Sequence, residues 1–249
     1  MSSDNDDSLN PENLKPTLKD VVYTAGKAGL GSIPVVGSLF SEIFGFSVEK
    51  PLEKRKTKFL IALKEDVEKL KNNQINIQEL ATNDEFIDVV FQAYELSIRN
   101  SQKEKLKALR NAILNTALGK IDVKRDEKMM FLSIINDLTP THLRVLNSWY
   151  NSDEAVNNIV NDAQKNVRQP RLPDDFAYFL KLDIKFYHIL LKQLDAWNLL
   201  QHTDNAAYFG TPHNEAVAKG IVNNICSAIE ERRTSFGRRF LRFISEPVF

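Results

Sequence analysis

The sequence predicts a mainly α-helical protein, and two observations support this fold class. Only nine glycines and nine prolines interrupt the 249 residues, and long segments repeat their apolar residues with the 3.6-residue period of a helix. Apolar residues make up 43% of the chain, which is ordinary for a globular protein and sufficient for a core. The length allows one large domain or two small ones.

Four helices with short links are predicted over residues 48–138, an arrangement that suits an antiparallel helical bundle. Pro51 can open the first helix, Asn83 or Asp84 can cap the second, and Ser101 starts the third, which Gly119 closes. The apolar faces of the four helices are marked in turn by Phe59, Leu63 and Val67; by Phe86, Val90 and Tyr94; by Leu106, Leu109 and Ile113; and by Met129, Met130, Ile134 and Ile135.

The second half of the chain is also predicted to be helical. Thr139-Pro140 is a strong helix start, because a capping residue stands next to a proline at the first helical position. Ser152 caps the next helix, and a loop over Gln169–Asp175 leads to the most apolar helix, at 176–200. A short strand is expected within Gln201–Gly210, followed by a helix at 214–231 and a last one from Thr234-Ser235 through Ile244.

This order of elements resembles a winged-helix domain with one or two short strands, in which an inserted helix separates the two wing strands. A second plain helical bundle is the alternative. The predicted division of the chain is an acidic tail over 1–16, a helical bundle over 17–138 and a C-terminal helical domain over 139–249.

The first candidate functional segment is an apolar hairpin at 21–46. Only Lys27 and Glu42 are charged in it, glycines are frequent, and Pro34 should break a helix near its middle. Two readings stay open: a membrane- or partner-contacting hairpin, or a hairpin buried in the core. The candidate contact residues are Gly29, Gly31, Pro34, Leu39, Phe40, Phe44 and Phe46. The glycines fit neither phosphate-binding template: a P-loop needs a Lys-Ser or Lys-Thr pair after the last glycine, and the dinucleotide fingerprint needs a strand before the first.

The second candidate is an arginine cluster near the C-terminus, which comprises Arg232, Arg233, Arg238, Arg239 and Arg242. On a helix from residue 235, the last three share one face, and phenylalanines occupy the other. A basic amphipathic helix can contact phosphates, anionic lipid or an acidic partner. The alternative is a packed terminal helix whose arginines are solvated or paired.

If the winged-helix order holds, its recognition helix offers Lys185, His188, Lys192 and Gln193. Because Asp183 and Asp195 lie close by, this face is not strongly basic, and a protein contact is favoured there over DNA.

No motif for catalysis or for a cofactor is found in the sequence. The four histidines are far apart in sequence, and no nucleophile-elbow motif is present. Cys226 lies among apolar residues at helical spacing, which favours a buried structural thiol. The 33 basic and 33 acidic residues balance, so any attraction for nucleic acid or membrane must be local. A non-enzymatic protein without cofactors is expected.

The N-terminal tail carries Asp4, Asp6, Asp7 and Glu12 without a basic residue, which is the opposite of a secretory signal. This indicates a cytoplasmic protein. If the hairpin at 21–46 contacts a membrane, the protein would lie at the cytoplasmic face of the inner membrane.

Several segments resemble those of uncharacterised bacterial helical proteins, and the layout is similar to that of the abortive-infection alpha family. The segments are 31–37 (GSIPVVG), 51–55 (PLEKR), 104–111 (EKLKALRN), 138–146 (LTPTHLRVL) and 237–241 (GRRFL). The resemblance implies a phage-defence setting and no known catalytic activity, and it assigns no functional residue.

The predicted function is therefore that of an interaction protein, a defence effector or its regulator. The expected contacts are with a protein partner, with a membrane surface and, if the chain forms a homo-oligomer, with further copies of itself. The alternative is a nucleic-acid-associated regulator that uses the winged-helix-like end and the arginine cluster.

Overall fold

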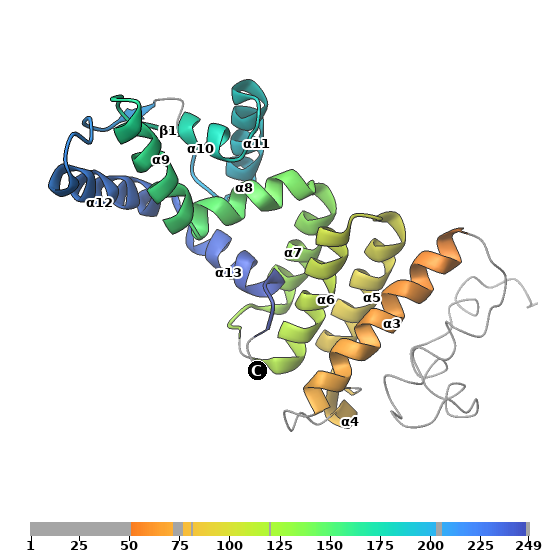
Figure 1. Cartoon of the computed structure of the whole chain (residues 1–249). Helices are drawn as coiled ribbons and strands as arrows, with labels where there is room; N and C mark the ends of the chain where they lie inside the picture. The colour runs from red at the N-terminus through yellow and green to blue at the C-terminus, as the bar shows by residue number, and fades with distance from the viewer. Residues whose placement is uncertain (1–50, 72–76, 81, 120, 203–205, 248–249) are drawn as a thin grey trace, which may run out of the picture.

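The computed structural model describes residues 51–71, 77–80, 82–119, 121–202 and 206–247. These residues are mainly helical and include one two-stranded sheet, which confirms the predicted fold class. Figure 1 shows two groups of helices, α3 to α7 and α8 to α12, with α13 running back from the second group to the first. The predicted acidic tail at 1–16 and the apolar hairpin at 21–46 lie outside the described residues.

The first group is the predicted bundle. Its helices are α3 (Pro51–Lys71), the short α4 (Ile77–Leu80), α5 (Asp84–Arg99), α6 (Lys103–Leu118) and α7 (Arg125–Asp137). Helix α5 packs against α3, α6 and α7, and α6 also packs against α3 and α7. Most residues of the predicted apolar faces are buried, and Tyr94, Leu106 and Met129 are partly buried. The prediction for Met130 is wrong, because this side chain is 50% exposed.

Local sequence signals set some of the helix ends in this bundle. The side chain of Asn83 accepts a hydrogen bond from the amide of Phe86, as expected of a helix cap. Gly119 adopts the left-handed conformation that ends α6, with a φ of 62°. The prediction for Ser101 was wrong, because Gln102 occupies the cap position of α6 and makes no side-chain cap bond.

The second group contains α8 (Pro140–Tyr150), α9 (Asp153–Lys165), α10 (Asp174–Phe179), α11 (Ile184–Ala196) and α12 (Glu215–Arg232). Helix α9 packs against α10 and α12, and α11 packs against α8 and α10. The start of α8 is the predicted one: the Thr139 hydroxyl accepts from the amide of His142, whose ring accepts from the amide of Thr139.

The single apolar helix predicted at 176–200 is wrong, since the structure has two helices there. Helix α10 ends at Phe179, Lys181 adopts a φ of 57°, and α11 begins at Ile184. The side chain of Asp183 accepts from the amide of Phe186 and so caps the start of α11. An apolar pattern alone does not reveal such a break, because both helices bury apolar residues in the same core.

Two strands of two residues each form an antiparallel sheet, in which β1 (Arg171–Leu172) pairs with β2 (Ala207–Tyr208). Strand β2 lies within the predicted strand region, whereas β1 occupies a segment predicted as a loop. The segment before α13 contributes only an isolated antiparallel bridge between Arg233 and Leu200. The second wing strand of the winged-helix prediction is thus reduced to that bridge within the described residues.

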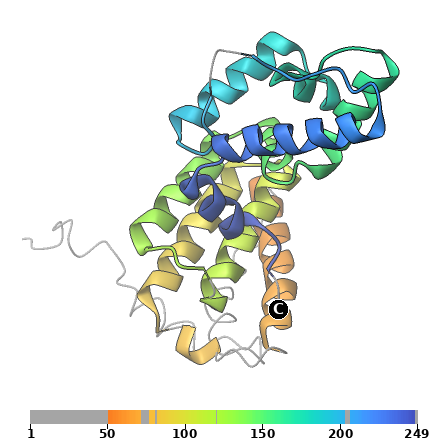
Figure 2. The ribbon, with the colours of Figure 1, turned by 90° about the vertical axis from the view of Figure 1, so that its left-hand side faces the viewer.

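Helix α13 (Ser235–Ile244) starts at its predicted cap, Thr234, but packs against α6 and α7 of the first group. Figure 2 shows it alongside the bundle, below the long α12. The ring of Phe131 in α7 meets three phenylalanines of α13, with centroid distances of 5.0 Å to Phe236, 5.3 Å to Phe240 and 5.5 Å to Phe243. One continuous apolar core therefore runs through both groups.

None of the helices in the described ranges combines the length and the apolar character needed to cross a bilayer.

Candidate functional site

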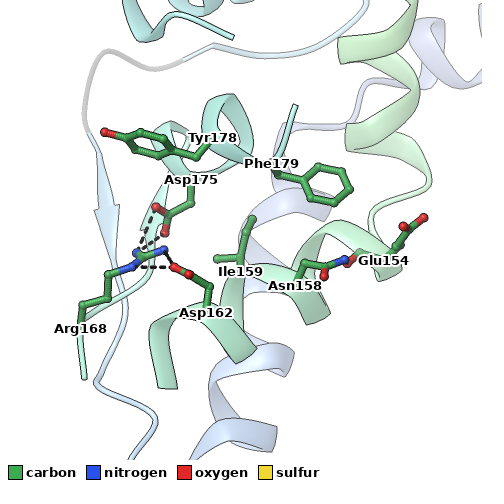
Figure 3. Close-up of a pocket in the computed structure, with 8 residues that line it drawn as sticks. All are labelled: Glu154, Asn158, Ile159, Asp162, Arg168, Asp175, Tyr178 and Phe179. Atoms are coloured by element: carbon green, nitrogen blue, oxygen red, sulfur yellow. Dashed lines mark hydrogen bonds and ion pairs between the residues drawn. The ribbon is translucent and has the colours of Figure 1, made fainter. Parts of the chain in front are cut away.

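An open cleft lies between α9 and α10 and has a volume of about 780 Å³ (Figure 3). This volume falls in the range of about 300–1,000 Å³ that is typical of ligand sites. The lining combines acidic, amide, aromatic and aliphatic side chains with one basic residue, and comprises Glu154, Asn158, Ile159, Asp162, Arg168, Asp175, Tyr178 and Phe179.

Helix α9 supplies one wall because its polar residues recur every four positions. Glu154, Asn158 and Asp162 stand at i, i+4 and i+8, and this spacing places them on one face of a helix. Ile159 lies beside this row and is buried, as are Val156 and Val160, because α9 packs against α10 and α12. Of these three residues only Ile159 lines the cleft, so one apolar side chain of α9 lies beside the polar row.

Arg168 closes one end of the cleft through ion pairs with two aspartates. Its Nη1 lies 2.9 Å from Oδ2 of Asp175, and its Nη2 lies 2.6 Å from Oδ2 of Asp162. The Asp175 side chain is only 5% exposed and also accepts a hydrogen bond from the amide of Arg171, at 2.7 Å. Burial alone would lower the pKa of Arg168, but the hydrogen bonds and charges of both aspartates outweigh it and raise that pKa. This guanidinium is therefore a structural group that holds α9 and α10 together.

The other end of the cleft is formed by Glu154, Asn158 and Phe179. In Figure 3 the Phe179 ring faces the side where Asn158 and Glu154 lie, opposite the Arg168 end. Asn158 donates from Nδ2 to the backbone oxygen of Glu154 at 2.8 Å, which leaves its own carbonyl oxygen as an acceptor. Within the described part of the chain, the Glu154 carboxylate enters no ion pair.

Tyr178 lies at the rim of the cleft with 66% of its surface exposed. A large exposed aromatic side chain beside a cleft is typical of a contact surface, because such rings are enriched at interfaces.

The cleft has an excess of negative charge. Three carboxylates, from Glu154, Asp162 and Asp175, face one guanidinium, from Arg168. Such a lining repels phosphates and favours a cationic ligand.

Two members of the predicted arginine cluster lie at the end of α12 and contact aromatic rings inside the second group. The guanidinium of Arg232 lies over the Trp149 ring at 5.5 Å, and burial lowers its pKa. Arg233 donates to the backbone oxygen of Trp149 at 2.8 Å and to the Ser152 hydroxyl at 3.0 Å, and it pairs with Glu230 at 2.9 Å. Ser152 is thus at the predicted cap position of α9, but its hydroxyl serves Arg233 and makes no cap bond.

The other three members lie on α13. Arg238 forms an ion pair with Glu230, and Arg239 pairs with Glu127 of α7 at 2.7 Å. Arg242 is exposed, and the residues described show no ion pair for it. The five arginines therefore do not converge on one open surface, and four of them hold α12 and α13 against their neighbours.

The residues predicted for a recognition helix lie on α11. His188 approaches Asp174 at 2.9 Å, and Gln193 approaches the ring of His142 at 2.6 Å, so both have partners inside the protein. Lys185 and Lys192 are exposed together with Phe186 and Ile189. This face is mixed in character, as the sequence indicated.

The hairpin residues predicted to contact membrane or partner lie outside the described residues. These are Gly29, Gly31, Pro34, Leu39, Phe40, Phe44 and Phe46.

The cleft itself was missed in the sequence analysis. The spacing of Glu154, Asn158 and Asp162 was visible, but a polar row on a helix usually faces solvent. The apolar pattern predicts one long helix through Tyr178 and Phe179, and nothing in that pattern sets these two residues opposite α9.

Cys226 is half-buried rather than fully buried, and burial raises the pKa of its thiol, which disfavours the reactive thiolate. Among the described residues, no group of three or more histidine, cysteine, aspartate or glutamate side chains is arranged to hold a metal ion. Comparisons with protein-family models, curated proteins and solved structures find no match for this chain.

Proposed function

We propose that this chain is a non-enzymatic interaction protein that binds a protein partner in the cleft between α9 and α10. The observation that carries the proposal is the combination of an open cleft, two apolar side chains in its lining, Ile159 and Phe179, and an exposed aromatic residue, Tyr178, at its rim. Interfaces are built in this way, with an aromatic anchor beside a polar border. The only basic side chain in the lining is held in internal ion pairs, which favours a role in shaping the cleft over a role in chemistry.

The proposal includes the setting that the family resemblance implies, a phage-defence effector or its regulator. In this setting the cleft binds the partner, and the apolar segment at 21–46 provides a second contact with a membrane or with the same partner. Liposome flotation of the full chain and of a variant lacking 21–46 tests the second contact. Flotation of the full chain alone supports it, and equal behaviour of two folded proteins removes it.

Site-specific photocrosslinking tests the cleft. A benzoylphenylalanine at position 178 keeps an aromatic ring at the rim, and the same residue at 208 or 61 samples other exposed apolar positions, since Tyr208 is 62% and Ile61 is 49% exposed. We expect position 178 to yield a discrete adduct, in the cells that produce the protein, which the two control positions do not yield.

The adduct must then be reproduced with purified components. The partner identified by mass spectrometry should bind the full chain, and Tyr178→Ala should weaken that binding at least about tenfold, because an aromatic hot spot contributes about 2 kcal/mol or more. Tyr208→Ala is the matched control and should retain wild-type affinity. An identical set of adducts from all three positions, or equal affinity of the two alanine variants, overturns the proposal.

A further inference from the structure

The two ends of the cleft offer different chemistry to a partner. At one end, Asp162 and Asp175 are neutralised in part by Arg168. At the other end, the lining consists of Glu154, Asn158 and Phe179, and no cation of the described residues pairs with the Glu154 carboxylate. Each end therefore keeps a formal charge of −1, but only the Glu154 carboxylate faces a ligand without a cation of the described residues beside it.

We propose that this end of the cleft binds the side chain of an arginine from the partner. The inference rests on the proposed function, since it specifies which residue of the bound partner the cleft recognises. The subsite, defined as Glu154, Asn158 and Phe179, has no basic side chain of its own, so a cationic group of the partner completes it.

The three side chains of the subsite match the three properties of a guanidinium. Its N–H groups donate in a fixed plane, which suits the two oxygens of the Glu154 carboxylate and the free carbonyl oxygen of Asn158. Its planar, weakly hydrated face stacks on aromatic rings, which suits Phe179. A lysine ammonium could use the carboxylate, but it lacks the planar fork, so arginine is favoured over lysine.

The rest of the cleft explains why a protein segment is the occupant. Arg168 bridges α9 and α10 at one end, and Figure 3 shows the exposed Tyr178 ring on that same side, away from Phe179. Residues of the partner that extend along the cleft from the bound arginine can therefore contact Tyr178. A volume of about 780 Å³ is larger than one side chain needs, so neighbouring residues of the partner can also enter.

The test is an NMR titration of the full-length protein with N-acetyl-arginine N-methylamide. Its citrulline analogue has nearly the same shape without the charge, and the lysine analogue has the charge without the fork. We expect amide shift changes to concentrate on residues 154–162 and 178–179, largest with the arginine compound, smaller with the lysine compound and smallest with citrulline. Raising the salt concentration should weaken the binding, because an exposed carboxylate is screened.

Three variants locate the effect. Glu154→Gln should weaken binding of the arginine compound about two- to fivefold, the range that an exposed ion pair gives. Phe179→Leu keeps an apolar side chain but removes the ring, and it should weaken arginine binding more than citrulline binding. The matched control is Asp153→Asn, which removes the same charge from the neighbouring exposed position outside the lining and should leave the affinity unchanged.

The proposal is overturned by equal shifts with arginine and citrulline, by shifts that map away from the cleft, or by no shifts at all. If a variant fails to fold, the comparison of the three compounds on the unchanged protein still tests whether the cleft prefers arginine. A partner crosslinked at position 178 together with equal arginine and citrulline binding refutes only the arginine subsite. Arginine binding without any partner adduct refutes the proposed function instead.

Discussion

Gly237 lies where α13 passes the end of α8, and only a hydrogen atom fits there. A Cβ at this position would lie 2.1 Å from the backbone oxygen of Leu199 and 2.3 Å from the hydroxyl of Tyr150. That hydroxyl is fixed in place, since it donates to the Leu199 oxygen at 2.8 Å and accepts from the amide of Thr234 at 2.9 Å. The close approach of three chain segments therefore depends on this glycine.

We expect Gly237→Ala to lower the free energy of unfolding by about 1–3 kcal/mol, because neither the backbone oxygen nor the fixed hydroxyl can move away without losing a hydrogen bond. Gly220→Ala is the matched control: apart from the backbone of its own helix, no atom lies within 4 Å of a Cβ there, and the residue is inside α12. This control should gain about 0.5–1 kcal/mol, since alanine favours a helix over glycine. Urea unfolding of both variants measures the difference, and a destabilised Gly220→Ala would contradict the argument.

We expect His142 to make the stability of the protein depend on pH. Its Nδ1 accepts from the amide of Thr139, so the neutral ring carries its proton on Nε2 and donates it to the Gln193 side chain at 2.6 Å. Burial lowers the pKa of His142 below its ordinary value of 6.5, more than the hydrogen bond with Gln193 raises it. Protonation at Nδ1 would remove the acceptor that the Thr139 amide uses.

The sign of the effect follows from the lowered pKa. Near pH 6.5 and somewhat below, the unfolded chain binds a proton at this histidine and the folded protein does not, so the stability contributed by neutral His142 is present above pH 6.5 and declines as the pH falls. We expect His142→Gln to be less stable at pH 7.5 by about 1 kcal/mol, since the helix cap is weakened. It should also lose less stability than the unchanged protein between pH 7.5 and 5.5.

Exposed His213 provides the control, because His213→Gln removes a histidine from the surface. Unfolding curves in urea at both pH values measure the two slopes. If His142→Gln and His213→Gln lose stability with pH to the same extent, the proposed role of His142 is wrong.

At the scale of elements, the end of α13 is held by side chains of another helix. Asn115 of α6 donates from Nδ2 to the backbone oxygens of Arg242, Phe243 and Ser245, at 3.1, 3.0 and 2.9 Å. Asn111, one turn earlier, donates to the oxygen of Ile244 at 2.8 Å. The last carbonyl groups of a helix have no partner within it, so these two asparagines satisfy them.

Asn115→Ala should therefore lower the free energy of unfolding by about 1–3 kcal/mol, because it leaves buried carbonyl groups without a partner. It should also increase amide hydrogen exchange in residues 235–247 more than elsewhere. Asn224→Ala, on the exposed side of α12, is the control and should change neither quantity by a comparable amount. Uniform exchange over the whole protein in Asn115→Ala would contradict a local anchoring role.

The sequence predicted the elements whose ends are set by neighbouring residues. Asn83, Thr139 with Pro140, and Thr234 all begin helices where the pattern placed them, because a cap and its amide partners lie within four residues. The break between α10 and α11 depends also on packing against α8 and α9. The apolar pattern does not record this packing and therefore predicts one continuous helix there. The cleft depends on that break, and so the pattern could not reveal it either.

The same limit explains the arginine cluster. The apolar pattern predicts the helix and the faces of α13 correctly, and Phe240 and Phe243 are buried. It did not give the partners of the arginines, since Glu127 is 112 positions away from Arg239. Whether a charged side chain is solvated or paired depends on contacts distant in sequence.

At the scale of the whole molecule, α13 joins the two helix groups into one folding unit. Its phenylalanines surround Phe131 of the bundle, while its start is hydrogen-bonded to Tyr150 of the second group. Because the apolar core is continuous through this contact, we expect the two groups to unfold together rather than in sequence.

Both tryptophans, Trp149 and Trp197, lie in the second group, whereas the far-ultraviolet circular dichroism signal reports helices of both groups. Phe131→Ala, which removes a fully buried ring from the bundle, should cost about 3–5 kcal/mol. If the core acts as one unit, this change shifts the urea midpoint seen by tryptophan fluorescence as far as the midpoint seen by circular dichroism. If the fluorescence midpoint stays unchanged while the dichroism curve shows two transitions, the two groups unfold independently. Phe131 would then stabilise only the bundle.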